Sequence, residues 1–142
     1  MQLNMGKYLS IFAATILLSS EAMAESSKNF LLELNTAETK GDACSITFVV
    51  KNELEASLEK VAYEFAFFDK QGRVDRISLL DFKSIAPQKM KVNRFKIPAI
   101  RCENISRILI NENTACQQSG AKSDFCKAAL KTENKTLIEF LK

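Results

Sequence analysis

The residues with the most distinctive chemistry in this sequence are four cysteines: Cys44, Cys102, Cys116 and Cys126. An even number of cysteines in a small exported domain is typical of disulfide bonds. Four cysteines allow three pairings, and the sequence alone does not choose among them. We favour Cys44–Cys102, which would tie an early strand to a late one, and Cys116–Cys126, which would close a short polar segment. Neither a zinc site nor a thioredoxin-like redox role is expected, because the chain has no Cys-x-x-Cys pair and no histidine.

The remaining reactive side chains do not indicate catalysis. General acid–base and nucleophilic chemistry most often uses histidine, or a serine or cysteine beside a base. Asp69, Asp75 and Asp81 recur at regular spacing, and two carboxylates can form a glycosidase pair. However, Asp69 falls in a predicted turn and Asp75 lies between Arg73 and Arg76. We interpret these aspartates as solvated positions, and expect a protein that is not an enzyme and that uses no catalytic residue, cofactor or metal.

A cluster of basic residues is the clearest charge pattern. The segment between Phe82 and Cys102 contains no acidic residue and six basic ones: Lys83, Lys89, Lys91, Arg94, Lys96 and Arg101. One interpretation is structural, because lysines on an edge strand hinder aggregation between sheets. The other is a surface for an acidic partner, such as an envelope protein, an anionic glycan or a lipid head group. The candidate partner-binding residues here are Lys89, Lys91, Arg94, Lys96 and Arg101. Nucleic acid is not an expected partner of an exported chain with a net charge of only +3.

The polar segment 112–127 around Cys116 and Cys126 is the second candidate binding region. Loops on a rigid scaffold often carry recognition, and a disulfide reduces the entropy lost when a loop is ordered by binding. We predict that 112–127 is a loop, with Gln117 and Gln118 as candidate contacts. The alternative is that this segment is only a disulfide-closed connection between strands, without a role in binding.

These candidates would be carried by a sheet scaffold. Period-two alternation of apolar residues, the mark of a half-buried strand, predicts strands over 30–35, 44–50, 61–68, 73–80, 90–97, 105–110 and 136–141. Gly72 is suited to the positive φ of the turn between two of them. The connections are too short for the helices of a parallel α/β fold. The sequence therefore predicts an all-β, immunoglobulin-like antiparallel sandwich of about seven strands, with one short helix over 123–131, capped by Ser123 or Asp124.

Residues 1–24 carry the features of a signal peptide. Lys7 precedes an apolar stretch over 8–18, and small residues precede a cleavage site after Ala24. The stretch is shorter than the roughly 20 residues that a membrane-spanning helix needs, so cleavage is favoured over a membrane anchor. Whether Met1 or Met5 is the start stays open. We expect residues 25–142 to be a single periplasmic domain without a transmembrane segment.

Three segments resemble a known family. Val50-Lys51-Asn52, the run Phe65-Ala66-Phe67-Phe68-Asp69-Lys70-Gln71-Gly72-Arg73-Val74 and the loop Ile85-Ala86-Pro87-Gln88 resemble the FxLYD type of bacterial domain, with Gln88 where glycine is usual. The resemblance covers about residues 45–97 and implies an immunoglobulin-like strand–turn–strand layout, but no chemistry. The whole chain also resembles small exported proteins of alphaproteobacteria, which implies a Gram-negative periplasm. The four cysteines depart from the plain FxLYD pattern.

Two functions follow as hypotheses. The first is a non-enzymatic periplasmic interaction module that binds an envelope protein through a sheet edge or the segment 112–127, for example as an accessory part of a transport or energy-transducing complex. The second is a small exported inhibitor or ligand-binding protein that uses the disulfide-stapled segment 112–127. The sequence does not identify the partner, the process or the oligomeric state.

Overall fold

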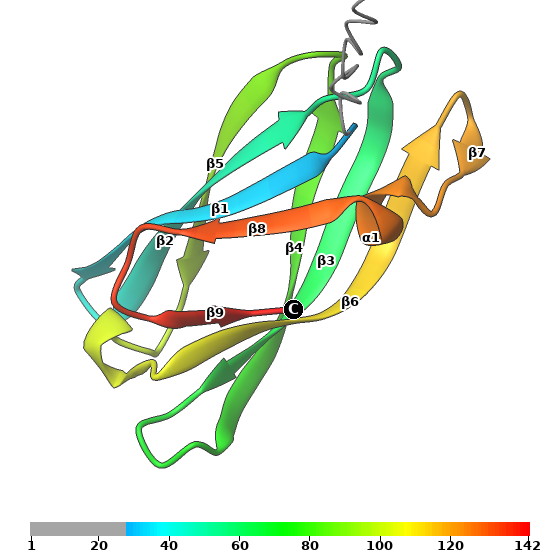
Figure 1. The fold of residues 1–142 in the computed structure, drawn as a ribbon. Coiled ribbons are helices and arrows are strands. Elements are labelled where there is room, and N and C mark those ends of the chain that lie inside the picture. Colours follow the sequence, from blue (N-terminus) through cyan, green and yellow to red (C-terminus); the bar gives the residue numbers. More distant parts are fainter. Residues whose placement is uncertain (1–27) are drawn as a thin grey trace, which may run out of the picture.

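The computed structural model describes residues 28–142, which form two β-sheets facing each other (Figure 1). The predicted signal peptide lies outside the described residues. The elements, in chain order, are β1 (Phe30–Lys40), β2 (Ala43–Asn52), β3 (Leu58–Phe68), β4 (Val74–Ile85), β5 (Met90–Ile97), the 3₁₀ turn η1 (Cys102–Asn104), β6 (Arg107–Gln118), β7 (Ala121–Lys122), α1 (Phe125–Ala128), β8 (Leu130–Asn134) and β9 (Glu139–Leu141). Among residues 28–142, no helix combines the length and hydrophobicity that crossing a bilayer requires.

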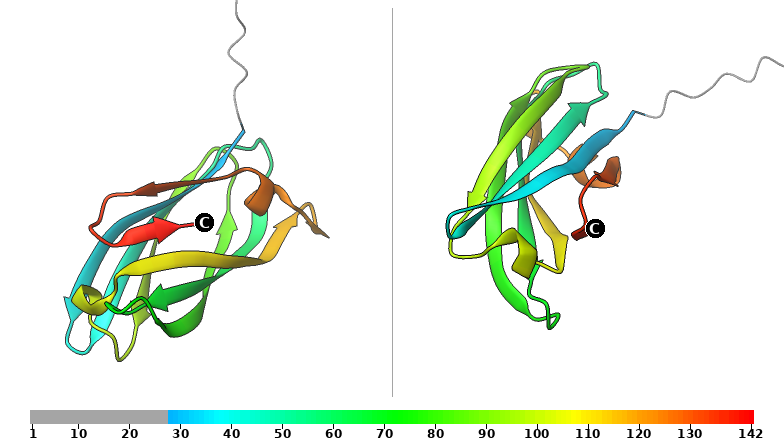
Figure 2. Two further views of the ribbon diagram at one scale, coloured as in Figure 1. Left: turned by 60° about the horizontal axis from the view of Figure 1, so that its bottom comes forward. Right: turned by 90° about the vertical axis from the view of Figure 1, so that its left-hand side faces the viewer.

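The predicted β-sandwich is confirmed, although two of its strand pairings are parallel. The β1 sheet has the order β5-β2-β1-β8, and the β3 sheet has the order β4-β3-β6-β7, with β9 also paired to β6. Strand β8 runs parallel to β1, and β9 runs parallel to β6. Both enter their sheet from the opposite sheet rather than through a hairpin, and such crossovers permit parallel pairing. Figure 2 shows the C-terminal strands closing one side of the sandwich.

The core is aromatic and lies between the sheets. Alternate residues of β1, β2 and β3 point inward, as their period-two pattern predicts. The ring of Phe48 on β2 lies 5.3 Å from that of Phe65 on β3 and 5.7 Å from that of Phe82 on β4, measured between centroids. These rings are fully buried. They join the two sheets, because Phe48 of the β1 sheet packs against Phe65 and Phe82 of the β3 sheet.

Both favoured disulfides are present: Cys44–Cys102 and Cys116–Cys126. The first links β2 to η1, across a sequence separation of 58 residues. The second links β6 to α1, across a separation of 10 residues. All four cysteines are buried. The bridges therefore belong to the scaffold, and no free cysteine remains among the described residues.

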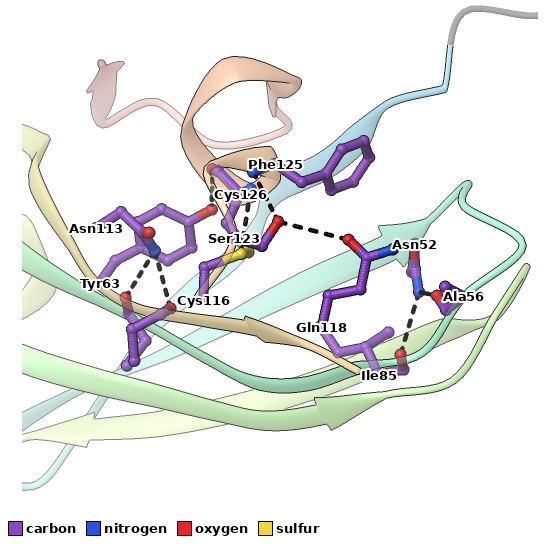
Figure 3. The surroundings of a disulfide bond; sticks show 12 residues. Asn52, Ala56, Tyr63, Ile85, Asn113, Cys116, Gln118, Ser123, Phe125 and Cys126 are labelled. Atoms are coloured by element: carbon purple, nitrogen blue, oxygen red, sulfur yellow. Dashed lines mark hydrogen bonds between the residues drawn. A yellow bond between two sulfur atoms is a disulfide. The ribbon is translucent and has the colours of Figure 1, made fainter. Parts of the chain in front are cut away.

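Asn52 connects two of the three segments on which the family resemblance rests. Its side chain is fully buried. The Nδ2 atom donates to the carbonyl oxygens of Ala56, at 2.9 Å, and Ile85, at 3.2 Å, while Oδ1 accepts the N–H of Leu54 at 3.0 Å (Figure 3). A buried amide side chain is tolerated when its donor and acceptor atoms are hydrogen-bonded. The Val-x-Asn strand end and the 85–88 loop are thus held together by one side chain.

Two sequence predictions about the C-terminal third were wrong in detail. Segment 112–127 is not a loop, because β6 continues to Gln118 and pairs with β3 as far as Leu58. The predicted helix over 123–131 is reduced to α1, because Leu130 already pairs with Phe30 of β1. Asp124, one of the two predicted caps, occupies the N-cap position without a capping side-chain hydrogen bond, and the Ser123 hydroxyl accepts the N–H of Phe125 at 3.2 Å.

Candidate interaction surfaces

The basic residues of segment 82–102 do not form one surface. Strand β5 alternates, so that Lys91 faces inward while Arg94 and Lys96 face outward. The Arg94 Nε donates to the Thr47 hydroxyl at 3.3 Å, and Arg101 contacts Glu103 at 2.5 Å. Among the described residues, the Lys89 and Lys96 ammonium groups have no polar partner within bonding distance. Only part of the predicted basic surface is therefore available for a partner.

Lys91 has a structural role at the edge of the sandwich. Its Nζ crosses from β5 to β4, where it donates to the carbonyl oxygens of Phe82, at 2.8 Å, and Ser84, at 3.2 Å. At the other end of the same edge, the Arg76 guanidinium of β4 donates to the carbonyl oxygens of Pro98 and Ala99. The carbonyl oxygens at both ends of this edge therefore accept hydrogen bonds from the protein's own cations. A charged, occupied edge resists pairing with another strand.

The stapled segment forms a rigid end of the β3 sheet. The buried Tyr63 hydroxyl donates to the carbonyl of Cys126 at 2.5 Å, and the N–H of Ser123 donates to the carbonyl of Cys116 at 2.9 Å (Figure 3). Burial raises the pKa of Tyr63, so the phenol stays a hydrogen-bond donor. The disulfide and these two bonds hold α1 against β6. The segment can present side chains in a fixed arrangement.

The two predicted contacts of this segment differ in exposure. Gln117 is exposed and pairs with Lys122 in the β6–β7 hairpin. Gln118 is half-buried, and its side-chain oxygen accepts the Ser123 hydroxyl at 3.4 Å. The hairpin and β5 lie on opposite sides of the sandwich, since β5 contacts β4 while α1 and β7 contact β6. The two predicted binding regions are therefore not brought together.

The three aspartates are each engaged by a neighbouring cation. The backbone N–H and the guanidinium of Arg73 both bind Asp69 and lower its pKa. Asp75 pairs with Arg76 at 3.0 Å. The Lys83 ammonium lies 2.7 Å from Asp81 and lowers the pKa of that carboxyl. These contacts stabilise turns and strand surfaces, and Asp69 and Asp75 line the same surface cavity.

An apolar row on the outer face of the β3 sheet was not predicted. Four apolar residues stand side by side in register across four strands, Ile77 on β4, Ala66 on β3, Leu109 on β6 and Leu141 on β9. Phe65 and Phe67 beside Ala66, and Ile108 and Ile110 beside Leu109, fill the core, so the row lies on the opposite face. Ala66 is only 4% exposed there, and Leu109 and Leu141 are half-buried. Ile77 is 55% exposed, and Leu79 beside it is 62% exposed. The outer face of an antiparallel sheet is ordinarily polar.

Carboxylates border this apolar row on one side. Glu64 lies next to Leu79 in register and directly opposite Glu112 on β6. Asn111 donates to Glu64 at 2.6 Å, but neither carboxylate forms an ion pair with a described residue. Like charges directly opposite each other destabilise a sheet. A cation supplied from outside would relieve that repulsion.

Comparisons with known proteins bear on the fold only. No family model matches the chain, and no curated protein matches it. Among solved structures, the chain is similar to IrmA from Escherichia coli, with a TM-score of 0.55 and 10% sequence identity. The match covers 73% of this chain and 90% of that one. At this identity, the likeness supports the shared sandwich fold and carries no function across.

Proposed function

We propose that the mature protein is a non-enzymatic interaction module of the bacterial periplasm that binds another envelope protein. An accessory part of a transport or energy-transducing complex is one form of this role. The observation that carries the proposal is the exposed apolar pair Ile77 and Leu79, at the β4 end of the apolar row of the β3 sheet. Contiguous exposed apolar surface on a folded domain marks interaction sites. The FxLYD resemblance supports the same class of small exported domain.

The partner proposed for this face is a folded protein with an apolar patch and basic residues at its rim. Apolar side chains would cover Ile77 and Leu79, which are more than half exposed. Basic side chains would neutralise Glu64 and Glu112, which face each other without a cation. Complementary charges of this kind favour the correct partner and orientation. The two disulfides support an oxidising compartment, which agrees with the predicted signal peptide.

Site-specific photo-crosslinking in intact envelopes tests this proposal. A photoreactive residue replaces Ile77 in one variant and Val92 in the other. Val92 is a matched control, because it is 62% exposed on an edge strand of the opposite sheet. We expect position 77 to yield one reproducible crosslinked protein whose contact peptide contains basic residues, and position 92 to yield none. Equal yields at both positions, or a crosslink only to a second copy of this chain, would contradict the proposal.

A small inhibitor or ligand binder is the second candidate, favoured by a cleft beside the stapled segment. The cleft has a volume of about 560 Å³, within the range of ligand sites. Tyr63, Ile110 and Leu130 contribute to its walls, and Lys122 and Lys127 line its mouth. This role requires the disulfide that shapes the cleft. A Cys116→Ser variant that retains full activity would contradict it.

A further inference from the structure

The outer half of β1 is an open strand edge. Strand β8 pairs only with Phe30–Leu34, and the N–H of Lys135 then donates to the Leu34 carbonyl at 2.9 Å before the chain turns away. Strand β1 continues to Lys40, past the end of β8 (Figure 1). On its other side, residues 36–40 pair with β2 in unbroken register. Within residues 28–142, no strand covers the free side of this stretch.

A groove lies beside this edge. It has a volume of about 740 Å³, and its walls are residues 35–39 of β1, the η1 region and the 135–138 turn between β8 and β9. Ala37, Ile105 and Ile138 supply apolar surface. Leu137, which is fully exposed, belongs to the same lining. The groove offers room for a side chain on one side of an added strand.

The η1 wall of the groove is fixed before anything binds. The Thr39 hydroxyl accepts the N–H of Cys102 at 3.0 Å and donates to the Glu103 carboxylate at 2.5 Å. The disulfide from Cys102 to Cys44 anchors the same turn to β2. A preformed site loses little conformational entropy on binding. The wall therefore does not need to rearrange around a ligand.

The edges of β4, β5 and β6 carry features that hinder strand addition. Lys91 occupies carbonyls of β4, and β5 itself is lined with cations. The edge of β6 between β9 and β7 is irregular, with register shifts opposite Tyr63 and Phe65, and Asn113 is inserted there against the Ala62 carbonyl. Bulges and charges are the usual means of preventing strand addition. Residues 36–40 lie beyond the register shift of β1 and form a regular edge.

We propose that this edge binds an extended peptide segment of a partner protein, which adds as a strand beside residues 36–40. The free backbone groups select an extended main chain. The apolar surface around Ala37 selects one apolar side chain. Lys70, which lines the groove and has no ionic partner among the described residues, selects a neighbouring carboxylate. This site is separate from the apolar row of the β3 sheet, so either proposal can fail while the other stands.

The test uses the oxidised mature protein and a phage-displayed library of seven-residue peptides. We expect selected peptides to combine an apolar and an acidic residue and to slow amide exchange within residues 36–40. Lys70→Glu should weaken binding of a selected peptide about fivefold, and Ala37→Trp, which fills the groove, should abolish it. Lys60→Glu is the matched control, an exposed lysine outside the groove, and should leave binding unchanged. Ile77→Glu should also leave it unchanged.

Several results would overturn the proposal. One is the absence of any selected peptide, and another is amide protection confined to other strands. Equal effects of Lys70→Glu and Lys60→Glu would point to non-specific charge attraction and would overturn it too. Protection of residues 36–40 in the free protein that increases with protein concentration would assign the edge to a second copy. The Lys70 variant keeps the test decisive if Ala37→Trp does not fold.

Discussion

The two disulfides should contribute unequally to stability, because they close loops of very different length. Cys44–Cys102 spans 58 residues and Cys116–Cys126 spans 10. A bridge that closes a longer loop removes more entropy from the unfolded chain. The loop-closure relation gives about 4.2 kcal/mol for the first bridge and about 2.7 kcal/mol for the second at 25 °C. The difference, about 1.5 kcal/mol, is a substantial part of a typical domain stability of about 5–15 kcal/mol.

The perturbation is a pair of double variants, Cys44→Ala with Cys102→Ala, and Cys116→Ala with Cys126→Ala. All four positions are buried, so the packing lost on truncation is comparable and the loop term distinguishes the variants. Urea unfolding under non-reducing conditions gives the free energy of unfolding of each. We expect the Cys44/Cys102 variant to be the less stable by about 1.5 kcal/mol. Equal losses, or a larger loss for the Cys116/Cys126 variant, would refute the reasoning.

Three further predictions concern single side chains. Asn52→Ala should destabilise the protein by about 3 kcal/mol in urea unfolding, because it leaves buried backbone groups unsatisfied, whereas Asn111→Ala on the surface should cost under about 0.5 kcal/mol; similar losses would contradict this. Ala99→Gly should raise stability by about 1 kcal/mol, because Ala99 has a φ of 54°; a loss of stability would show that the backbone is not strained there. The Thr39 hydroxyl and the Arg101 guanidinium lower the pKa of Glu103 to about 2, from 4.5. Its interactions therefore stabilise the fold above pH 4.5 and are lost as the pH falls toward 2. Glu103→Gln should flatten that part of a pH–stability profile, and an unchanged profile would contradict the assignment.

The main strands were predictable from the sequence because they depend on local pattern. Phe30, Leu32 and Leu34 alternate with less buried residues, as a half-buried strand requires. Cys44 falls in such a strand, and its bond to Cys102 follows the expected link between an early and a late segment. The alternation is contained within a few neighbouring residues, whereas the favoured disulfide pairing was one of three that the sequence allows.

The C-terminal elements were less predictable because they depend on distant partners. Residues 112–118 belong to the segment predicted as a loop, yet pairing with β3 makes them part of a strand. Residues 130–134 carry no alternating apolar pattern, and become β8 only because β1 has a free side. Parallel pairing with a distant strand leaves no turn signature in the sequence.

The candidate surfaces were predicted in part. Lys91 was grouped with the basic residues, but its inward position follows from the register of β5 against β2. The apolar row was not predicted from the sequence, because its members become neighbours only when four strands are aligned. They are Ile77, Ala66, Leu109 and Leu141. The apolar pair Ile77 and Leu79, followed by buried Leu80, was the available signal, since it places apolar side chains on both faces of one strand.

The most direct measurement of the central claim compares binding by two charge-bearing double variants, once the partner is identified by crosslinking. Ile77→Glu with Leu79→Glu places charges on the outer face of the β3 sheet, and Met90→Glu with Val92→Glu places them at similarly exposed positions on the opposite sheet. Calorimetric titration of the purified partner should show at least a hundredfold weaker binding for the first variant and unchanged affinity for the second. Unchanged affinity for the Ile77/Leu79 variant would contradict the assignment of this face.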